Sequence, residues 1–252
     1  MHTAKLAAPL LVLLAWVVGA APARAETVNC TPILALPAVI TEQGVYCFTG
    51  DLATAITSGN AIDIQTNNVV LDLNGFKLGG LGAGLGTVAN GIFAFNRQNL
   101  TIKNGTVRGF MSGIALFGTG QGHVVEDIRA DHNTIRGIVV EGTGNLIRNN
   151  QVIATGGGTC CGTGTAAVGI RAAGTGPRVL NNDVIDTTSP GDVASRGIQF
   201  PALVTGGLAV NNRITNADIP IEYDLSSNGK YRDNLTFGTG GFEGGTDAGN
   251  NN

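Results

Sequence analysis

The chain has 252 residues, of which 39 are glycine and only 13% are charged, and its formal net charge at pH 7 is −3. Because phosphate backbones are bound mainly by clustered Lys and Arg, this balance argues against nucleic acid as a partner. Hydrophobic residues make up 43% of the chain. They alternate with polar residues, which excludes a disordered chain and favours half-buried strands.

Residues 1–25 are predicted to be a signal peptide. Lys5 supplies a charged start, an apolar stretch follows, and Ala23-Arg24-Ala25 matches a cleavage site. A retained membrane anchor is the alternative. We expect a secreted or periplasmic protein without a membrane span after cleavage, with 13 basic and 18 acidic side chains and hence a formal charge of −5.

All four cysteines follow the predicted signal peptide. Cys30 and Cys47 lie 17 residues apart, and export makes a disulfide between them the simplest pairing. Cys160 and Cys161 are adjacent, so a vicinal disulfide, two free thiols and intermolecular pairing all remain open.

Residues 26–59 differ in composition from the rest and are predicted to form an N-terminal cap. A stack of coils exposes apolar interior and unpaired strand edges at its ends, so it needs such a cover. The alternative, a small independent binding domain, is disfavoured because the segment is too short to bury its own core.

A repeat extends over residues 60–237. Each unit opens with an isoleucine, and the intervals are 30, 22, 24, 32, 28 and 23 residues: Ile62, Ile92, Ile114, Ile138, Ile170, Ile198 and Ile221. A repeat with a minimum near 22 residues, built from short alternating runs, indicates a solenoid. We predict about seven coils of three strands each, in which Ile62 and Ile64 point inward and Asp63 points outward.

An asparagine or aspartate follows each of these isoleucines after about 12 to 14 residues: Asn74, Asn104, Asp127, Asn150, Asn182, Asn212 and Asn234. Asparagine tolerates a left-handed backbone at turns, and stacked amides can hydrogen-bond along an axis. We therefore predict that these residues are structural rather than ligand-binding.

The segments NVVLDLNG, GIFAF, LTIKNGTVRGF and SGIAL resemble the pectate-lyase-like superfamily, in particular its secreted bacterial branch. This resemblance covers residues 60–237 and implies an all-β fold, a right-handed parallel β-helix. Members of the superfamily include polysaccharide lyases, glycoside hydrolases, uronate epimerases, esterases and non-catalytic adhesins, so the fold does not select an activity. Residues 238–252, rich in Gly and Asn, lack periodicity and are predicted to be a flexible tail or a loose cap.

Two long insertions, Gly79 to Ala89 and Thr155 to Ala167, are predicted to form the walls of a cleft. Both fall between a third strand and the next first strand, and two short corners lie between them, around Met111-Ser112 and Asp131 to Thr134. Insertions in a solenoid map to loops on one side and often build its binding face.

The predicted cleft floor contains the candidate catalytic residues Asp131, His132 and Arg136. Histidine titrates near neutrality, and an adjacent carboxylate can orient it for general acid or base chemistry. A basic column is predicted to bind substrate carboxylates: Lys77, Arg108 and Arg129. The structural alternative is that Asp-His-Asn forms a turn and that the cations lie on ordinary solvated strands.

A second candidate group lies on the first-strand face: Arg171, Gln199, Glu222 and Asp224. Paired carboxylates suit hydrolysis, although simple alternation also explains outward charges. No calcium-lyase Asp cluster, P-loop or zinc spacing is present, so we expect no metal and no cofactor, with calcium left open.

The favoured function is a secreted β-helix protein, expected to be a monomer, that binds or processes an acidic polysaccharide. Whether it is an enzyme stays open; if it is one, β-elimination is the expected reaction. The alternative is a non-catalytic surface, matrix or adhesin-like scaffold.

Overall fold

The computed structural model describes residues 29–162 and 164–252, and the predicted signal peptide lies outside them. Within the described part the chain is built from parallel strands, and the one helical segment there is a short 3-10 turn, η1 (Leu81–Ala83). Among the described residues, no helix has the length and apolar character to cross a membrane.

One sheet has eight parallel strands and collects the repeated isoleucines. Ile62, Ile92 and Ile114 pair in register, and all three are fully buried. The strands, in spatial order, are β2 (Ala38–Ile40), β5 (Asn60–Ile64), β8 (Asn90–Phe95), β10 (Ser112–Phe117), β12 (Arg136–Val140), β15 (Val168–Ala172), β18 (Arg196–Phe200) and β21 (Ile219–Tyr223).

A second, sixteen-stranded sheet forms the other two faces as two arms. The first arm contains β1 (Thr31–Ile33), β3 (Gly44–Phe48), β6 (Val69–Asp72), β9 (Leu100–Arg108), β11 (Val124–Asp131), β13 (Leu146–Arg148), β16 (Arg178–Leu180), β19 (Gly207–Val210), β22 (Gly229–Arg232) and β24 (Thr246–Asp247). The second contains β4 (Leu52–Ala53), β7 (Lys77–Gly79), β14 (Gln151–Gly156), β17 (Asp183–Thr188), β20 (Arg213–Ala217) and β23 (Leu235–Thr239). The long strands β9 and β11 belong to both arms and join them.

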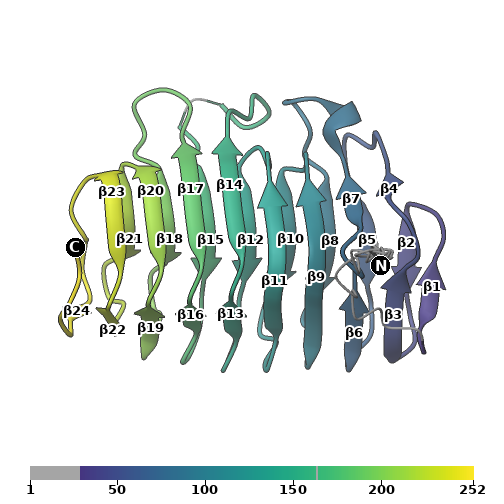
Figure 1. Cartoon of the computed structure of the whole chain (residues 1–252), viewed down its shortest axis with the longest axis horizontal. Coiled ribbons are helices and arrows are strands. Elements are labelled where there is room, and N and C mark those ends of the chain that lie inside the picture. The colour runs from purple at the N-terminus through teal and green to yellow at the C-terminus, as the bar shows by residue number, and fades with distance from the viewer. Residues whose placement is uncertain (1–28, 163) are drawn as a thin grey trace, which may run out of the picture.

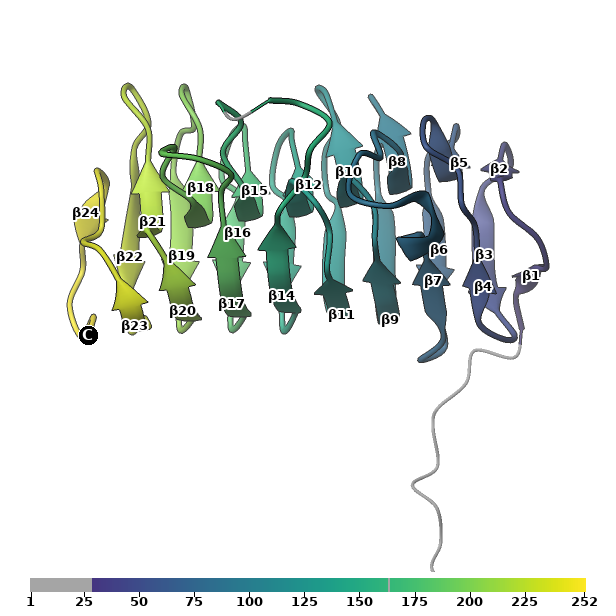
Figure 2. The same cartoon turned by 90° about the horizontal axis from the view of Figure 1, so that it is seen from above.

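The predicted parallel β-helix is therefore confirmed. Figure 1 shows the strands side by side along the axis, and in Figure 2 the eight-stranded sheet lies along the upper edge with β14, β17 and β20 along the lower one. The inward side chains of the three faces form one continuous apolar core.

The N-terminal segment, predicted to be a cap, pairs with the stack as its first coil. Ala38 pairs with Ile62, Tyr46 with Leu71, and Leu52 with Leu78, so β2, β3 and β4 make a complete coil. Counted by the strands of the smaller sheet, the chain has eight coils where about seven were expected.

Residues 238–252, for which a flexible tail or a loose cap is predicted, pair with the last coil. β24 pairs with β22, and the backbone N–H of Asn234 donates to Oδ1 of Asn251 at 3.0 Å. The tail ends in asparagines that repeat the turn chemistry of earlier coils, so it continues their hydrogen bonding.

The predicted asparagine ladder exists in the C-terminal half of the stack. Asn150, Asn182, Asn212 and Asn234 are buried, and each backbone N–H donates to the side-chain oxygen of the next asparagine at 2.9–3.0 Å. Asn104 departs from it and donates to Asp72. The position before each buried asparagine takes the left-handed conformation, at Asn149, Asn181, Asn211 and Asp233.

Candidate functional site

Two of the three predicted catalytic residues, Asp131 and His132, lie where β11 ends, beside the end of β9. Arg108, the last residue of β9, is the register partner of Asp131, the last residue of β11. Neighbouring parallel strands are about 4.8 Å apart, so the two side chains leave the sheet next to each other. His132 follows directly at the corner.

Asp131 is the electrostatic centre of this site. It is only 4% exposed, and its carboxylate lies 3.7 Å from Nη2 of Arg108 and 3.4 Å from Nε of Arg129. Burial raises its pKa, but the hydrogen bond with His132 and the charges of Arg108 and Arg129 together outweigh burial and lower the pKa below the ordinary value. The carboxylate is therefore ionised at neutral pH.

His132 is oriented by this carboxylate. Its backbone is left-handed, with φ of 51°, and its Nδ1 is in contact with Oδ1 of Asp131. The side chain is 56% exposed, and His132 lines a cavity of about 230 Å³. With Nδ1 engaged, Nε2 is the ring nitrogen left to exchange a proton with a ligand.

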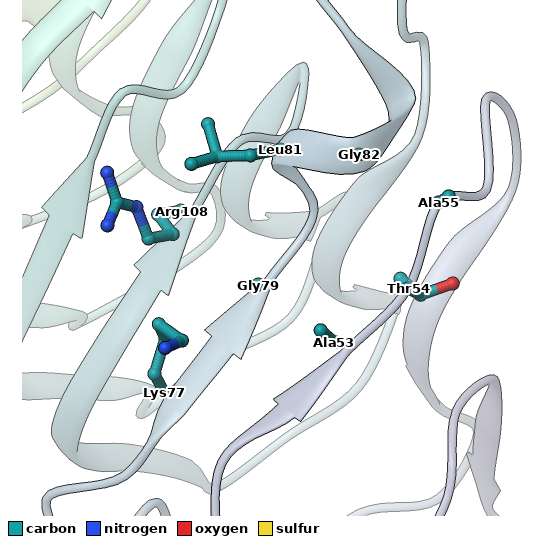
Figure 3. A pocket seen from close by; sticks show the side chains of 8 residues that line it. All are labelled: Ala53, Thr54, Ala55, Lys77, Gly79, Leu81, Gly82 and Arg108. Carbon is teal, nitrogen blue, oxygen red and sulfur yellow. The ribbon is translucent and has the colours of Figure 1, made fainter.

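Arg108 is the cation whose donors remain available. Its guanidinium has no hydrogen bond within the described part of the chain, and its buried Nε has no partner there. It lines a second cavity of about 460 Å³ together with Lys77 and Leu81. Figure 3 shows Arg108 and Lys77 on one side of this cavity and Ala53 on the other. A guanidinium in this state can receive a carboxylate in bidentate geometry.

The predicted column of Lys77, Arg108 and Arg129 is wrong. In the strand register, Thr106 is the partner of both Lys77 and Arg129. Arg108 is instead the partner of Gly79 and Asp131, two residues further along the strands. Four residues separate Asp72 from Lys77, but only two separate their register partners in the next coil, Lys103 and Thr106. The two extra residues shift the charged positions out of register.

Lys77 and Arg129 also have partners inside the protein. Nζ of Lys77 lies 2.9 Å from the carboxylate of Asp51, and Nη1 of Arg129 donates to Oε1 of Gln151 at 2.9 Å. Arg108 is thus better placed than either to bind an anionic ligand.

Arg136 does not join Asp131 and His132. It opens β12 in the eight-stranded sheet, and it lines neither of the two cavities. Burial is the main cause that lowers its pKa; the charge of Arg171 adds to this, and that of Glu141 opposes it. Its electrostatic partners are Arg171 on β15 and Glu141, which directly follows β12.

The two predicted walls meet each other. The backbone N–H of Thr159 donates to the carbonyl of Leu85 at 3.0 Å, so the insertion after β7 touches the insertion after β14. Figure 1 shows both segments on the same edge, and Figure 2 shows the first extending along the axis toward β10. The smaller cavity lies beneath this contact, between Leu85 and Thr134.

Both cysteine pairs are joined. The predicted disulfide between Cys30 and Cys47 is confirmed, with a Cα–Cα distance of 5.8 Å. Cys160 and Cys161 form a vicinal disulfide, which settles the alternatives left open for this pair. The second disulfide directly follows Thr159, the residue of this wall that contacts Leu85.

The second predicted group is divided between two structural clusters. Glu222 is buried and accepts hydrogen bonds from Arg196 at 2.9 Å and from Gln199 at 2.7 Å. Arg171 instead pairs with Glu141. Asp224 accepts from the backbone N–H of Leu225.

Arg196 and Glu141, the partners that satisfy this group, were not predicted, because strand register decides which outward charges meet. Among the residues that the structure describes, no group of three or more His, Cys, Asp and Glu side chains is arranged to hold a metal ion.

Comparisons with known proteins show the fold. No family model and no curated protein matches the sequence. The crystal structure of the Dettilon tailspike protein matches with a TM-score of 0.55 and 16% identity, over 81% of this chain and 46% of the tailspike. An alginate lyase from Paenibacillus sp. str. FPU-7 matches with a TM-score of 0.55 and 14% identity, over 79% of this chain and 71% of the lyase.

At these identities the likeness establishes a shared parallel β-helix, as the sequence resemblance predicted. The chain spans about half the length of the tailspike.

Proposed function

We propose that the protein binds an acidic polysaccharide at Arg108. We further propose that His132, oriented by Asp131, acts as the general base in β-elimination. The observation that carries this proposal is the juxtaposition of unlike groups at one edge. A guanidinium without a hydrogen bond in the described chain lies beside a buried, ionised carboxylate that orients an exposed imidazole.

The proposed chemistry assigns one role to each side chain. The uronate carboxylate pairs with Arg108, which withdraws electron density from the neighbouring carbon. Nε2 of His132 takes the proton from that carbon, a double bond forms, and the glycosidic oxygen leaves and is protonated by water. Asp131 stabilises the imidazolium that forms, because its pKa is held low by the same cluster.

The structural neighbours support a carbohydrate ligand. One of them is an alginate lyase, which shares the parallel β-helix at 14% identity. The two disulfides are typical of an oxidising compartment and support secretion.

A non-catalytic scaffold is the second candidate, and the ion pairs of the outer surface favour it. Arg148 lies 2.6 Å from Glu126, Arg232 lies 2.7 Å from Asp233, and Lys77 pairs with Asp51. Cations paired in this way present little net charge to a polyanion.

The test measures binding and product with length-matched polyuronates, following the ultraviolet absorbance of the unsaturated sugar. Arg108→Ala is expected to weaken binding by about tenfold, because it removes a charge-assisted hydrogen bond worth roughly 1.5 kcal/mol. His132→Ala is expected to abolish product formation and to change binding much less.

Arg178→Ala is the matched control, since Arg178 is exposed on β16 and lines none of the cavities described here. Binding without product in the wild type would support the scaffold. Unchanged binding in the Arg108 variant would contradict the proposed site.

A further inference from the structure

The smaller cavity has a different character from the cleft around Arg108. It has a volume of about 230 Å³, and its roof is made by Leu81 and Leu85 from the insertion after β7. Its floor includes two small residues, Gly109 directly after β9 and Ala154 within β14. Pockets for drug-sized ligands measure about 300–1,000 Å³, so this space suits a substituent of a bound sugar rather than a length of polymer.

Close packing of the insertion on the strand ends produces this cavity. Gly109 has φ of +79°, and a Cβ there would lie 2.4 Å from the backbone nitrogen of Leu81. A side chain at Gly109 would therefore push the roof away. Leu81 also lines the larger cavity that contains Arg108, so a ligand bound there lies directly beside the smaller space.

Thr134 contributes a polar side chain to this cavity. It lines the smaller cavity, it is only 2% exposed, and its hydroxyl has no hydrogen-bond partner in the described part of the chain. Buried hydroxyl groups in proteins are almost always hydrogen-bonded, because an unsatisfied one is unfavourable. A ligand oxygen in this cavity would satisfy the Thr134 hydroxyl.

We propose that this cavity binds an O-acetyl group carried by the acidic polysaccharide, with the methyl group against Leu81 and Leu85 and the carbonyl accepting from Thr134. The inference rests on the proposed function. A methyl ester has a similar size, but it would remove the carboxylate charge that pairs with Arg108, whereas O-acetylation leaves that charge in place. The structure thus favours a polyuronate that is acetylated on a hydroxyl.

The experiment compares three polymers of matched length: an O-acetylated polyuronate, the same preparation after alkaline removal of the acetyl groups, and a methyl-esterified one. The wild type is expected to bind the acetylated form about tenfold more tightly than the deacetylated form, which corresponds to about 1.4 kcal/mol. The methyl-esterified polymer is expected to bind most weakly.

Two variants place this preference in the cavity. Thr134→Val keeps the shape and removes a hydroxyl that has no partner, so the fold is expected to remain stable while the preference falls. Leu85→Ser is also expected to lower the preference for the acetylated polymer. Since Leu85 is 57% exposed, the fold is expected to tolerate this change. Leu225→Ser, at a side chain that is 87% exposed, is the matched control.

The outcomes separate the two proposals. Equal binding of the acetylated and deacetylated polymers overturns the acetyl site and leaves the proposed function intact. A preference that survives in both Thr134→Val and Leu85→Ser also overturns the site. If the wild type binds none of the three polymers, the proposed function itself is overturned.

Discussion

Replacing Asn182 with alanine is expected to lower the free energy of unfolding by about 2–4 kcal/mol. The side-chain Nδ2 of Asn182 carries two hydrogens and lies 3.0–3.1 Å from three acceptors, the carbonyls of Ile147 and Leu180 and Oδ1 of Asn212. Its Oδ1 accepts from both the backbone and the side-chain nitrogen of Asn150, each at 3.0 Å. The alanine variant therefore interrupts the ladder between two coils.

The magnitude follows from the groups left behind. The side chain of Asn150 keeps a second acceptor, the carbonyl of Val125, but its backbone N–H loses its acceptor. An unsatisfied buried donor costs about 1–3 kcal/mol. The cavity left by the deleted side-chain atoms adds to this, at about 24 cal/mol per Å³.

Urea unfolding followed by far-ultraviolet circular dichroism measures the effect, and hydrogen exchange at the Asn150 amide locates it. Thr205→Ala is the control, because it removes an exposed hydroxyl–hydroxyl contact of 3.2 Å and is expected to change stability by less than about 0.5 kcal/mol. An Asn182→Ala effect as small as this control, with unchanged exchange at Asn150, would refute the argument that the ladder stabilises the stack.

Two further predictions concern other buried groups. Burial lowers the pKa of His123 to about 4, and an unfolded histidine titrates near about 6.5. The unfolded state therefore binds more protons in this window, so stability is expected to fall as the pH drops from about 6.5 to about 4, and His123→Asn is expected to flatten the profile. The Cys30–Cys47 disulfide closes a 17-residue separation, and Cys30→Ser with Cys47→Ser is expected to cost about 3 kcal/mol in thermal unfolding. The adjacent pair Cys160–Cys161 closes no loop, so an equal loss from Cys160→Ser with Cys161→Ser would contradict this entropic reasoning.

The coil-forming positions could be predicted from the sequence because their chemistry repeats. The isoleucines at the start of each unit, such as Ile62 and Ile92, alternate with polar residues, and burial of one face follows directly. The buried asparagines were predictable for the same reason. The pairing of the two ends of the stack could not be predicted, because β2 to β4 and β24 match the repeat less closely. Only their strand pairing shows that they belong to the stack.

The candidate site could be predicted only in part. Asp131 and His132 are neighbours in the sequence, so their contact needs little tertiary information. The separation of Lys77 from Arg108 depends on two extra residues at one corner, and strand register cannot be read from the spacing of charges. The contact between Leu85 and Thr159 depends on the path of two loops, which their lengths alone do not determine.

The asparagine ladder makes the C-terminal half of the helix modular. Each coil there offers the same amide to the coil before it and to the coil after it, as at Asn150 and Asn212. A whole coil could be duplicated or lost without leaving a donor unsatisfied, and the length of the molecule would change by about 4.8 Å. The cleft adjoins the first coil of this ladder, because Ala154 and Gly156 of β14 line the smaller cavity, so coils added beyond Asn182 leave its lining residues unchanged.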